Sequence, residues 1–293
     1  MSKIVVIGSC SMDLVVTSSK RPNAGETVLG ESFKTVPGGK GANQAVASAR
    51  LGADVYMVGR IGDDSYGQEI LQNLQDQGVN TDYMKPVTEM ESGTAHIILA
   101  EGDNSIVVVK GANDEVTPDY VKEALTSIKN ADIVLIQQEI PEETVEAVCT
   151  LCTKRNIPVI LNPAPAREVK QEVLHQAAYL TPNEHEAALI FQGLSPAEAL
   201  RLYPNKLLIT EGKSGVRYFD GEKEVLVPGF PVQAVDTTGA GDTFNGALAV
   251  ALTEGKPLFE ALSFANLAAS ISVTKFGAQG GMPSREELER TTS

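Results

Sequence analysis

The sequence predicts an α/β protein in which a central, mainly parallel sheet lies between layers of helices. Three observations support this fold class. Short runs of β-branched residues alternate with longer stretches of helical period over the 293 residues, as in parallel sheets covered by helices. The strand-like runs are apolar throughout, which is typical of strands buried on both faces. Two regions lack intervening helices and predict a second, smaller sheet.

The main sheet is predicted from six strand-like segments. These are expected at Lys3 to Ile7, Asp54 to Val58, Ile133 to Ile136, Pro158 to Leu161, Tyr179 to Thr181 and Leu207 to Thr210. The helices between them place apolar residues three and four positions apart, as in Ile70, Leu71 and Leu74. They are expected at Gly41 to Leu51, Tyr66 to Gln77, Pro118 to Lys129, Glu142 to Arg155, Gly241 to Thr253 and Leu258 to Thr274.

The two regions without helices are Leu14 to Val36 and Ser92 to Val109. The second carries Glu101-Gly102-Asp103-Asn104 between two strand-like runs, which is a strong signal for a hairpin turn. We expect both regions, residues 14–36 and 92–109, to form one small β-sheet that covers a site as a lid on a single domain spanning residues 1–293. The alternative is a surface hairpin without a role.

Composition limits the classes of partner. Hydrophobic residues make up 42% of the chain and charged residues 21%, which is ordinary for a globular protein. The net charge is -14 and basic residues never cluster beyond a pair, which argues against nucleic-acid binding. The short apolar run after Lys3 is too short for a signal sequence or a membrane span. Three cysteines, Cys10, Cys149 and Cys152, make no disulfide framework, so we expect a cytoplasmic protein.

The strongest chemical motif runs from Asp236 to Phe244 and reads Asp-Thr-Thr-Gly-Ala-Gly-Asp-Thr-Phe. The small residues Gly239 to Gly241 allow a tight turn that presents backbone N–H groups to an anion, and the helix that follows adds its positive dipole end. Asp242 lies beside this anion site, where a base for a hydroxyl group is expected. The alternative is a helix cap, in which Asp242 only satisfies free amides.

A second glycine cluster, Gly38 to Asn43, opens the next predicted helix. Backbone N–H groups, the Lys40 ammonium and the Asn43 carboxamide form a set suited to a polyol, although a glycine-rich turn without a ligand would look the same. Asp13 follows the first strand, at the carboxyl edge where such sheets bind ligands. The glycines near Gly8 do not have the dinucleotide spacing, so a dehydrogenase is disfavoured.

Two further groups of residues carry weaker signals. Cys149 and Cys152 have the spacing of a redox dithiol, but they fall in the middle of a predicted helix, so buried thiols are favoured. The three histidines are scattered without a zinc spacing.

Together these motifs resemble the ribokinase-like (PfkB-type) carbohydrate kinase family, and the resemblance runs nearly from end to end. The two glycine motifs carry most of it. Supporting matches are Glu139, Asn162 to Arg167, Thr181 to Glu184 and Thr210 to Gly215. The fold that the resemblance implies is a Rossmann-like sheet between helices, with a β-lid that often joins two subunits.

The resemblance also implies roles for single residues. Asp242 would be the catalytic base, with Gly239, Ala240 and Gly241 forming the anion hole. The sugar would be held by Ser11, Met12, Asp13, Gly39, Lys40, Gly41, Ala42, Asn43, Glu139 and Asp242. ATP would be bound by Asn183, Thr210, Glu211, Gly212, Lys213, Ser214, Gly215, Gly241, Asp242 and Asn266. Glu186 would face Mg²⁺ through water, and K⁺ would be held near Asp236, Thr238, Ser272, Lys275, Gly277 and Gly281.

The activity implied by the resemblance is transfer of the ATP γ-phosphate to the 5-hydroxyl of D-ribose, with Mg²⁺ accompanying ATP and K⁺ as an activator. The expected partners are ATP, the sugar and a second copy of the chain joined through the lid, with no nucleic acid and no membrane. Three alternatives stay open: a kinase for another small sugar, a nucleoside kinase, and a sugar sensor without catalysis. A nucleoside kinase would need an aromatic surface for the base, and the first forty-five residues offer only Phe33.

Overall fold

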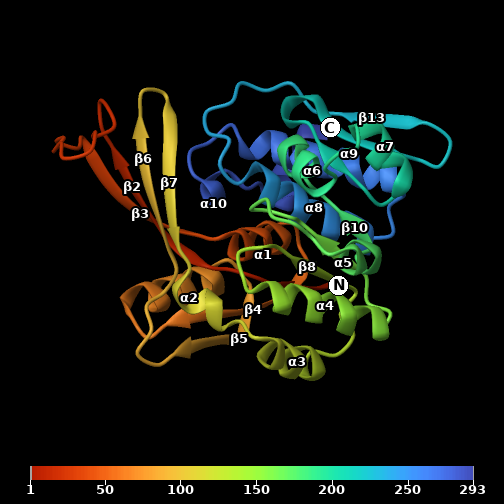
Figure 1. Cartoon of the computed structure of the whole chain (residues 1–293), viewed down its shortest axis with the longest axis horizontal. Helices are drawn as coiled ribbons and strands as arrows, with labels where there is room; N and C mark the ends of the chain where they lie inside the picture. Colours follow the sequence, from red (N-terminus) through yellow and green to blue (C-terminus); the bar gives the residue numbers. More distant parts are fainter. Residues whose placement is uncertain (1, 293) are drawn as a thin grey trace.

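The computed structural model describes residues 2–292, and its centre is a sheet of six parallel strands (Figure 1). In spatial order they are β10 (Tyr179–Leu180), β9 (Val159–Leu161), β8 (Ile133–Ile136), β1 (Lys3–Ile7), β4 (Asp54–Gly62) and β5 (Asn80–Val87). Every neighbouring pair is parallel. The predicted parallel sheet is therefore confirmed, with β5 as an edge strand that the sequence pattern did not indicate.

The central strand β1 shows why the sheet needs helices on both sides. Its residues alternate between the two faces. Ile4 and Val6 pack into a core with the helices α1 (Lys40–Arg50), α8 (Ala240–Thr253) and α9 (Leu258–Ser272). Val5 and Ile7 pack into a second core with α3 (Pro118–Ser127) and α4 (Glu142–Lys154). Figure 1 shows these two helical layers on opposite sides of the sheet.

The lid is a separate sheet of four strands, at the upper left of Figure 1. Its order is β3 (Ser32–Gly38), β2 (Ser11–Thr17), β6 (Thr94–Ala100) and β7 (Asp103–Val109). The predicted hairpin turn is confirmed, because Ala100 pairs with Asp103 and the two residues between them, Glu101 and Gly102, have φ of 57° and 74°. Strand β7 is exposed along its whole length and forms one edge of the lid.

The strand expected at 207–210 is shorter in the structure than predicted, and its last two residues belong to another sheet. It forms β11 (Ile209–Thr210), which belongs to a third, antiparallel sheet with β12 (Gly215–Phe219) and β13 (Glu224–Pro228). Two parallel bridges, Leu180 with Leu207 and Asn183 with Thr210, and three backbone hydrogen bonds connect this segment to the end of the main sheet. The expected strand therefore lies parallel beside β10, whereas β11 itself pairs with β12 in the antiparallel sheet.

The remaining helices are short apart from α2, and all predicted helices agree with the structure to within two residues at each end. They are α2 (Ser65–Asp76), η1 (Gly111–Glu115), α5 (Gln171–Gln176), α6 (Glu184–Ile190), α7 (Pro196–Leu202), η2 (Gly212–Ser214), α10 (Ala278–Gly281) and α11 (Arg285–Thr292). Cys149 and Cys152 are free and fully buried in α4, where burial raises the pKa of both thiols to about 12.

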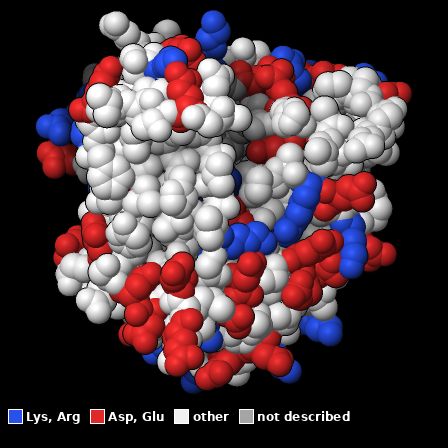
Figure 2. Space-filling view, turned by 60° about the vertical axis from the view of Figure 1, so that its left-hand side comes forward, with Lys and Arg blue, Asp and Glu red and all other residues white. Residues whose placement is uncertain are grey.

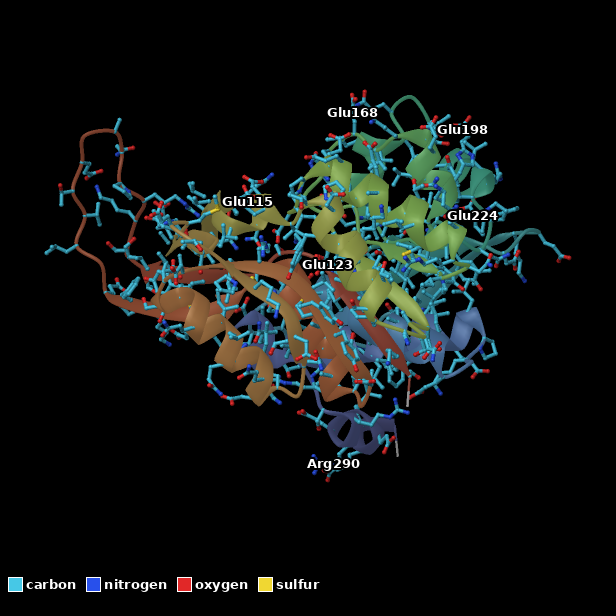
Figure 3. All side chains as sticks on the ribbon, turned by 90° about the horizontal axis from the view of Figure 1, so that it is seen from below. Glu115, Glu123, Glu168, Glu198, Glu224 and Arg290 are labelled. Atoms are coloured by element: carbon cyan, nitrogen blue, oxygen red, sulfur yellow. The ribbon has the colours of Figure 1, made fainter. Side chains whose placement is uncertain are left out.

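The charged side chains lie mainly on the outer elements. Figure 2 shows acidic groups crowded over the lower part of one face and a broad uncharged area over its upper part. Figure 3 labels charged residues on separate outer elements: Glu115, Glu123, Glu168, Glu198, Glu224 and Arg290. Within residues 2–292, no helix has both the length and the apolar character that crossing a bilayer requires.

Candidate active site

Two cavities meet at the amino end of α8. One, of about 320 Å³, is lined by residues from α6, α8, α9 and the third sheet, and we call it the nucleotide cavity. The other, of about 200 Å³, lies between the main sheet and the lid, and we call it the sugar cavity. Lys40, Gly239 and Asp242 line both of them. A group transferred from one cavity to the other would therefore pass these three residues.

Asp242 lies in the first turn of α8 and is 6% exposed. Its carboxylate accepts two hydrogen bonds from α1: Oδ2 from Asn43 Nδ2 and Oδ1 from Gln44 Nε2, each at 3.0 Å. Neither oxygen caps its own helix, since the N-cap residue of α8 is Gly239 and the helix has no side-chain cap. The helix-cap alternative for Asp242 is therefore not supported.

The electrostatics suit a proton acceptor. Burial raises the pKa of Asp242, while the Lys40 charge and the amides of Asn43 and Gln44 act in the opposite direction and limit the rise. A carboxylate with a raised pKa is a better base for a hydroxyl group at neutral pH. Burial also opposes the charge of Lys40, but Asp242, Glu139 and Glu186 outweigh it, so the pKa of Lys40 is raised and the ammonium stays charged.

The anion site is the turn that starts α8. Gly239 has φ 77°, in the left-handed region that favours glycine, and it directs the next amides toward the cavities. The amides of Gly241 and Asp242 belong to the first helical turn, so they have no acceptor within the helix. Together with the helix dipole they can stabilise a phosphate that carries developing negative charge.

The sugar cavity is walled by polar groups that come from the ends of strands. Seven of the predicted sugar residues line it: Ser11, Asp13, Gly39, Lys40, Asn43, Glu139 and Asp242. Glu139 is fixed by Ser9 Oγ and by the Lys40 amide, which both donate to its Oε2 at 2.5 and 3.0 Å. The carboxylate of Asp13 occupies the space that a side chain at position 38 would need, since a Cβ on Gly38 would lie 2.5 Å from its oxygens.

Asp13 is a second carboxyl group in the site whose pKa is raised. Burial raises its pKa to about 6, the hydrogen bond from Ser11 Oγ opposes the rise, and the charges of Glu139 and Asp242 add to it. Near neutral pH the group is mostly ionised and can accept hydrogen bonds from sugar hydroxyls. No aromatic side chain is among the described residues that line this cavity.

The nucleotide cavity contains most of the predicted ATP residues. They are Asn183, Thr210, Gly212, Gly215, Gly241, Asp242 and Asn266, with Glu186 beside them. Glu186 Oε2 accepts from the Asn183 backbone N–H and Asn183 Oδ1 accepts from the Glu186 backbone N–H, so each side chain is held by the backbone of the other residue in a capping box at the start of α6. A carboxylate at the rim of a phosphate cavity is suitable chemistry for Mg²⁺ bound through water.

The expected K⁺ residues lie in two chain segments: the loop before α8, and the segment from the end of α9 to α10. Asp236 Oδ1 accepts from the Thr238 amide and hydroxyl, and its Oδ2 accepts from the Gly277 amide. Burial alone would raise the pKa of Asp236, but these hydrogen bonds overcome it and the pKa is lowered. The end of α9 and α10 pack tightly, since a Cβ on Gly281 would lie 2.0 Å from the Ser272 carbonyl oxygen. An ionised carboxylate is a suitable group for a monovalent cation.

Some predicted residues lie away from the cavities. Met12 and Ala42 are fully buried in the core, and Gly41 lines neither cavity. Side chains alternate along β2, so the Met12 side chain points into the core whereas Ser11 and Asp13 line the cavity. On the nucleotide side, Glu211, Lys213 and Ser214 do not line the cavity. Glu211 instead forms an ion pair with Arg217 through two hydrogen bonds. Among the expected K⁺ residues, the Lys275 ammonium forms an ion pair with Glu287.

A set of buried polar residues beside the site was given no role from the sequence, although Asn162 and Thr181 belong to segments that carry the family resemblance. Gln44, Gln137, Asn162, Thr181 and Asn245 are all nearly inaccessible and are joined by hydrogen bonds. Three of them directly follow β8, β9 and β10 in the sequence. Polar residues immediately after apolar parallel strands were the signal that could have found them, because ligands bind at this edge of a sheet.

A polyol cavity and a phosphate cavity that meet at a buried carboxylate and a helix N-terminus define a phosphotransferase acting on a hydroxyl group. The family model for pfkB family carbohydrate kinases matches residues 1–285, and the chain belongs to this family.

Individual relatives support this assignment. The chain is 70% identical to the ribokinase of Bacillus subtilis over the full length of both, and 46% identical to that of Lactococcus lactis, covering 99% of this chain and 96% of the relative. It also resembles the solved structure of Arabidopsis thaliana ribokinase complexed with ribose and ATP, with a TM-score of 0.91 and 36% identity over 99% of this chain and 98% of the other.

Proposed function

We propose that this kinase transfers the γ-phosphoryl group of ATP to the 5-hydroxyl of D-ribose, giving ribose 5-phosphate and ADP. The observation that carries the proposal is the meeting of the sugar and nucleotide cavities at Asp242, Lys40 and Gly239. The two substrates are supported by the ribokinases that match this chain over its full length and by the Arabidopsis ribokinase, whose structure is complexed with ribose and ATP.

In the proposed reaction Asp242 removes the proton from the 5-hydroxyl. The resulting oxygen forms a bond to the γ-phosphorus, and the bond between this phosphorus and the β–γ bridging oxygen breaks, so that ADP leaves. The amides at the start of α8 and the Lys40 ammonium stabilise the charge on the transferred group. Little covalent chemistry is required of the protein, so its main contribution is position and electrostatic stabilisation.

Two cations belong to the proposal. Mg²⁺, when bound with ATP, neutralises phosphate charge, and Glu186 with Asn183 would face it through water. K⁺ would be held by Asp236, Thr238 and the carbonyls of the adjacent loop, including those of Ser272, Lys275, Gly277 and Gly281. Its role would be to fix the shape of the segment between Asp236 and Asp242, which forms the anion site.

Selection of the sugar follows from the lining of the cavity. Asp13, Asn43 and Glu139 offer acceptors and donors to several hydroxyls of a small polyol, and a missing hydroxyl would leave one of these buried groups without a partner. A nucleoside would place its base against the lid residues Ile97, Ile106 and Val108, which offer no aromatic face. Ribose is therefore favoured over nucleosides.

Assembly and location are part of the same proposal. The exposed edge strand β7 carries Ile106, Val107, Val108 and Val109, each about half exposed or more, and an unpaired apolar edge favours pairing with a second copy. We infer a homodimer joined through the lid. The three free thiols support a reducing compartment such as the cytoplasm.

The test is a panel of sugars with ATP, Mg²⁺ and K⁺, in which ADP release is measured and the product is identified by ³¹P and ¹³C NMR. We expect ribose to give the highest kcat/KM and a phosphate ester at the 5-position. A higher kcat/KM for adenosine, deoxyribose or fructose 6-phosphate would contradict the assignment of ribose. No ADP release with any member of the panel would favour a sugar sensor.

A further inference from the structure

We propose that Gln44 is a positioning residue for the transfer reaction, whose side-chain amide fixes the Asp242 carboxylate from behind while the sugar approaches from the front. The proposal rests on the proposed function, because it takes Asp242 as the base. Gln44 follows Asn43 on α1 and is completely inaccessible to solvent. It lines neither the sugar cavity nor the nucleotide cavity.

The amide of Gln44 makes three hydrogen bonds, and each ties a different part of the fold. Its Nε2 donates to Asp242 Oδ1 at 3.0 Å and to Asn162 Oδ1 at 3.2 Å, and its Oε1 accepts from Gln137 Nε2 at 2.7 Å. Asp242 lies on α8, Asn162 directly follows β9, and Gln137 directly follows β8. Since both donor positions and the carbonyl are engaged, rotation of the Gln44 amide would break several bonds at once.

Asn43 supplies the second amide hydrogen bond to Asp242, and its surroundings differ from those of Gln44. Asn43 Nδ2 donates to Asp242 Oδ2, and Asn43 also lines the sugar cavity, where a bound sugar could contact it. Gln44 is inaccessible and lines neither cavity, so a bound sugar would not contact it directly. We infer that Gln44 holds the carboxylate in one rotamer before the sugar arrives, leaving the remaining lone pairs available for the hydroxyl proton.

The packing of α1 on α8 makes this contact possible. A Cβ on Gly246 would lie 2.7 Å from the Ala47 Cβ and 2.9 Å from the Gln44 carbonyl oxygen, so the two helices approach closely because position 246 has no side chain. Ser48 Oγ reaches across the same contact to the Gly246 carbonyl at 3.3 Å. The close approach brings the Gln44 side chain within reach of a carboxylate on the next helix.

Gln137, the residue that donates to Gln44, keeps one polar atom without a partner in this arrangement. Its Nε2 donates to Gln44, whereas its buried Oε1 has no hydrogen-bond partner among the described residues. The Gln137 amide is thus oriented by its bond to Gln44.

Several charged groups face Asp242 and set the background for any change at Gln44. Lys40 comes from α1, Glu139 follows β8, Asp13 comes from β2 and Glu186 from α6. A hydrogen bond from an amide stabilises the ionised form of a carboxylate. Removing the Gln44 donor should therefore both loosen the carboxylate and make it easier to protonate.

The experiment compares Gln44→Met, Gln44→Glu, Ser48→Ala and Asp242→Asn in the full-length protein, with kcat expressed per folded molecule from circular dichroism. Gln44→Met keeps the length of the side chain and removes the donor. We expect kcat to fall roughly 10- to 100-fold, as for loss of one hydrogen bond to a charged group, while KM for the sugar changes by less than about twofold. The acidic limb of the kcat profile should move up by about one pH unit.

Gln44→Glu is nearly the same shape and places a second carboxyl group against Asp242, so the acidic limb should move up further than in Gln44→Met. Ser48→Ala is the matched control, since Ser48 lies one turn along α1 and bonds to α8 without contacting the carboxylate. It should lower stability without moving the pH profile.

The outcomes separate this proposal from the proposed function. If Gln44→Met keeps kcat within about twofold while Asp242→Asn is inactive, Gln44 does not position the base, although the base itself is confirmed. An equal fall in kcat without a change of pH profile in Gln44→Met and Ser48→Ala would show a loss of packing and would also overturn the proposal. Activity in Asp242→Asn would instead contradict Asp242 as the base.

Discussion

Asn43 donates a hydrogen bond to Asp242 across 199 positions of sequence, with 3.0 Å between Asn43 Nδ2 and Asp242 Oδ2. The side-chain oxygen of Asn43, Oδ1, accepts in turn a hydrogen bond from Gln279 Nε2 at 3.1 Å. Asn43 also lines the sugar cavity. The residue therefore connects the binding of the sugar to the orientation of the carboxylate that acts on it.

The first prediction concerns the base. Asp242→Asn should lower kcat by roughly 10²–10⁴-fold while sugar and ATP still bind, because Asn keeps the shape but cannot take a proton. A coupled assay for ADP and calorimetry for ribose would measure the two effects. Asp114→Asn, at an exposed position on η1, is the control and should leave kcat unchanged.

Two glycines of α8 give opposite expectations. A Cβ at Gly241 would meet nothing within 4 Å, so Gly241→Ala should fold with unchanged stability yet lose roughly 10- to 100-fold in kcat if the phosphate approaches this backbone. A Cβ at Gly246 would meet the Ala47 Cβ at 2.7 Å, so Gly246→Ala should lower the free energy of unfolding by about 1–3 kcal/mol. Urea unfolding and steady-state kinetics distinguish them, and a fully active Gly241→Ala would place the phosphate elsewhere.

The third prediction is a pH dependence of sugar binding. Because the pKa of Asp13 is raised to about 6, its carboxylate becomes protonated below that pH and loses acceptor capacity. KM for ribose should therefore rise as the pH falls from 7 to 5, and this rise should be absent in Asp13→Asn, whose KM is high throughout. A KM that is constant from pH 5 to 8 would show that Asp13 does not bind the sugar in its ionised form.

The same carboxylate predicts a stability change of defined sign. Its pKa in the folded protein lies above the ordinary value, so Asp13 contributes stability below about pH 4 and loses it as the pH rises through 6. Asp13→Asn should therefore raise Tm at pH 8, roughly by 2–4 °C, and have little effect at pH 4. Calorimetry of both proteins at the two pH values checks the sign.

The fourth prediction concerns assembly through the lid. Val107 is 66% exposed on the edge strand β7. Light scattering should give a dimer mass at micromolar concentration, and Val107→Lys should give a monomer, since a charge on the edge disfavours strand pairing. Leu202→Lys, on the exposed side of α7 and far from the lid in Figure 1, should remain a dimer. A monomeric parent protein would rule out the dimer.

The fifth prediction concerns the monovalent cation. Replacing K⁺ by tetramethylammonium at constant ionic strength should lower kcat, because the bulky ion cannot enter the loops that contain Asp236 and Gly277. Asp236→Asn should remove the difference between the two salts. Equal rates of the parent protein in both salts would contradict a K⁺ site.

The sequence predicted the elements that have a strong hydrophobic pattern. Strands β1 and β8 match to the residue, and the turn at Gly239 that starts α8 lies where its small residues predicted a turn. Strand β5 was missed because it lies at the sheet edge, contains Pro86 and has mostly polar residues, so it shows no apolar run.

Gln44 was missed for a different reason. A buried glutamine on a helix of small apolar residues has no local pattern, and its role exists only where α8 packs on α1. Met12 was placed in the site because its neighbours Ser11 and Asp13 lie there, whereas alternation along β2 turns it into the core.

The contact between α1 and α8 also determines when the site can exist during synthesis. At the usual elongation rate of roughly 5–20 residues per second, Asp242 is made about 10–40 s after Asn43, since 199 positions separate them. Throughout this interval the nascent chain carries Ala45, Val46 and Ala47 of α1 without the helix that later covers them. The growing chain therefore exposes this apolar face before α8 is made, and catalytic activity reports that the last quarter of the polypeptide has joined the first.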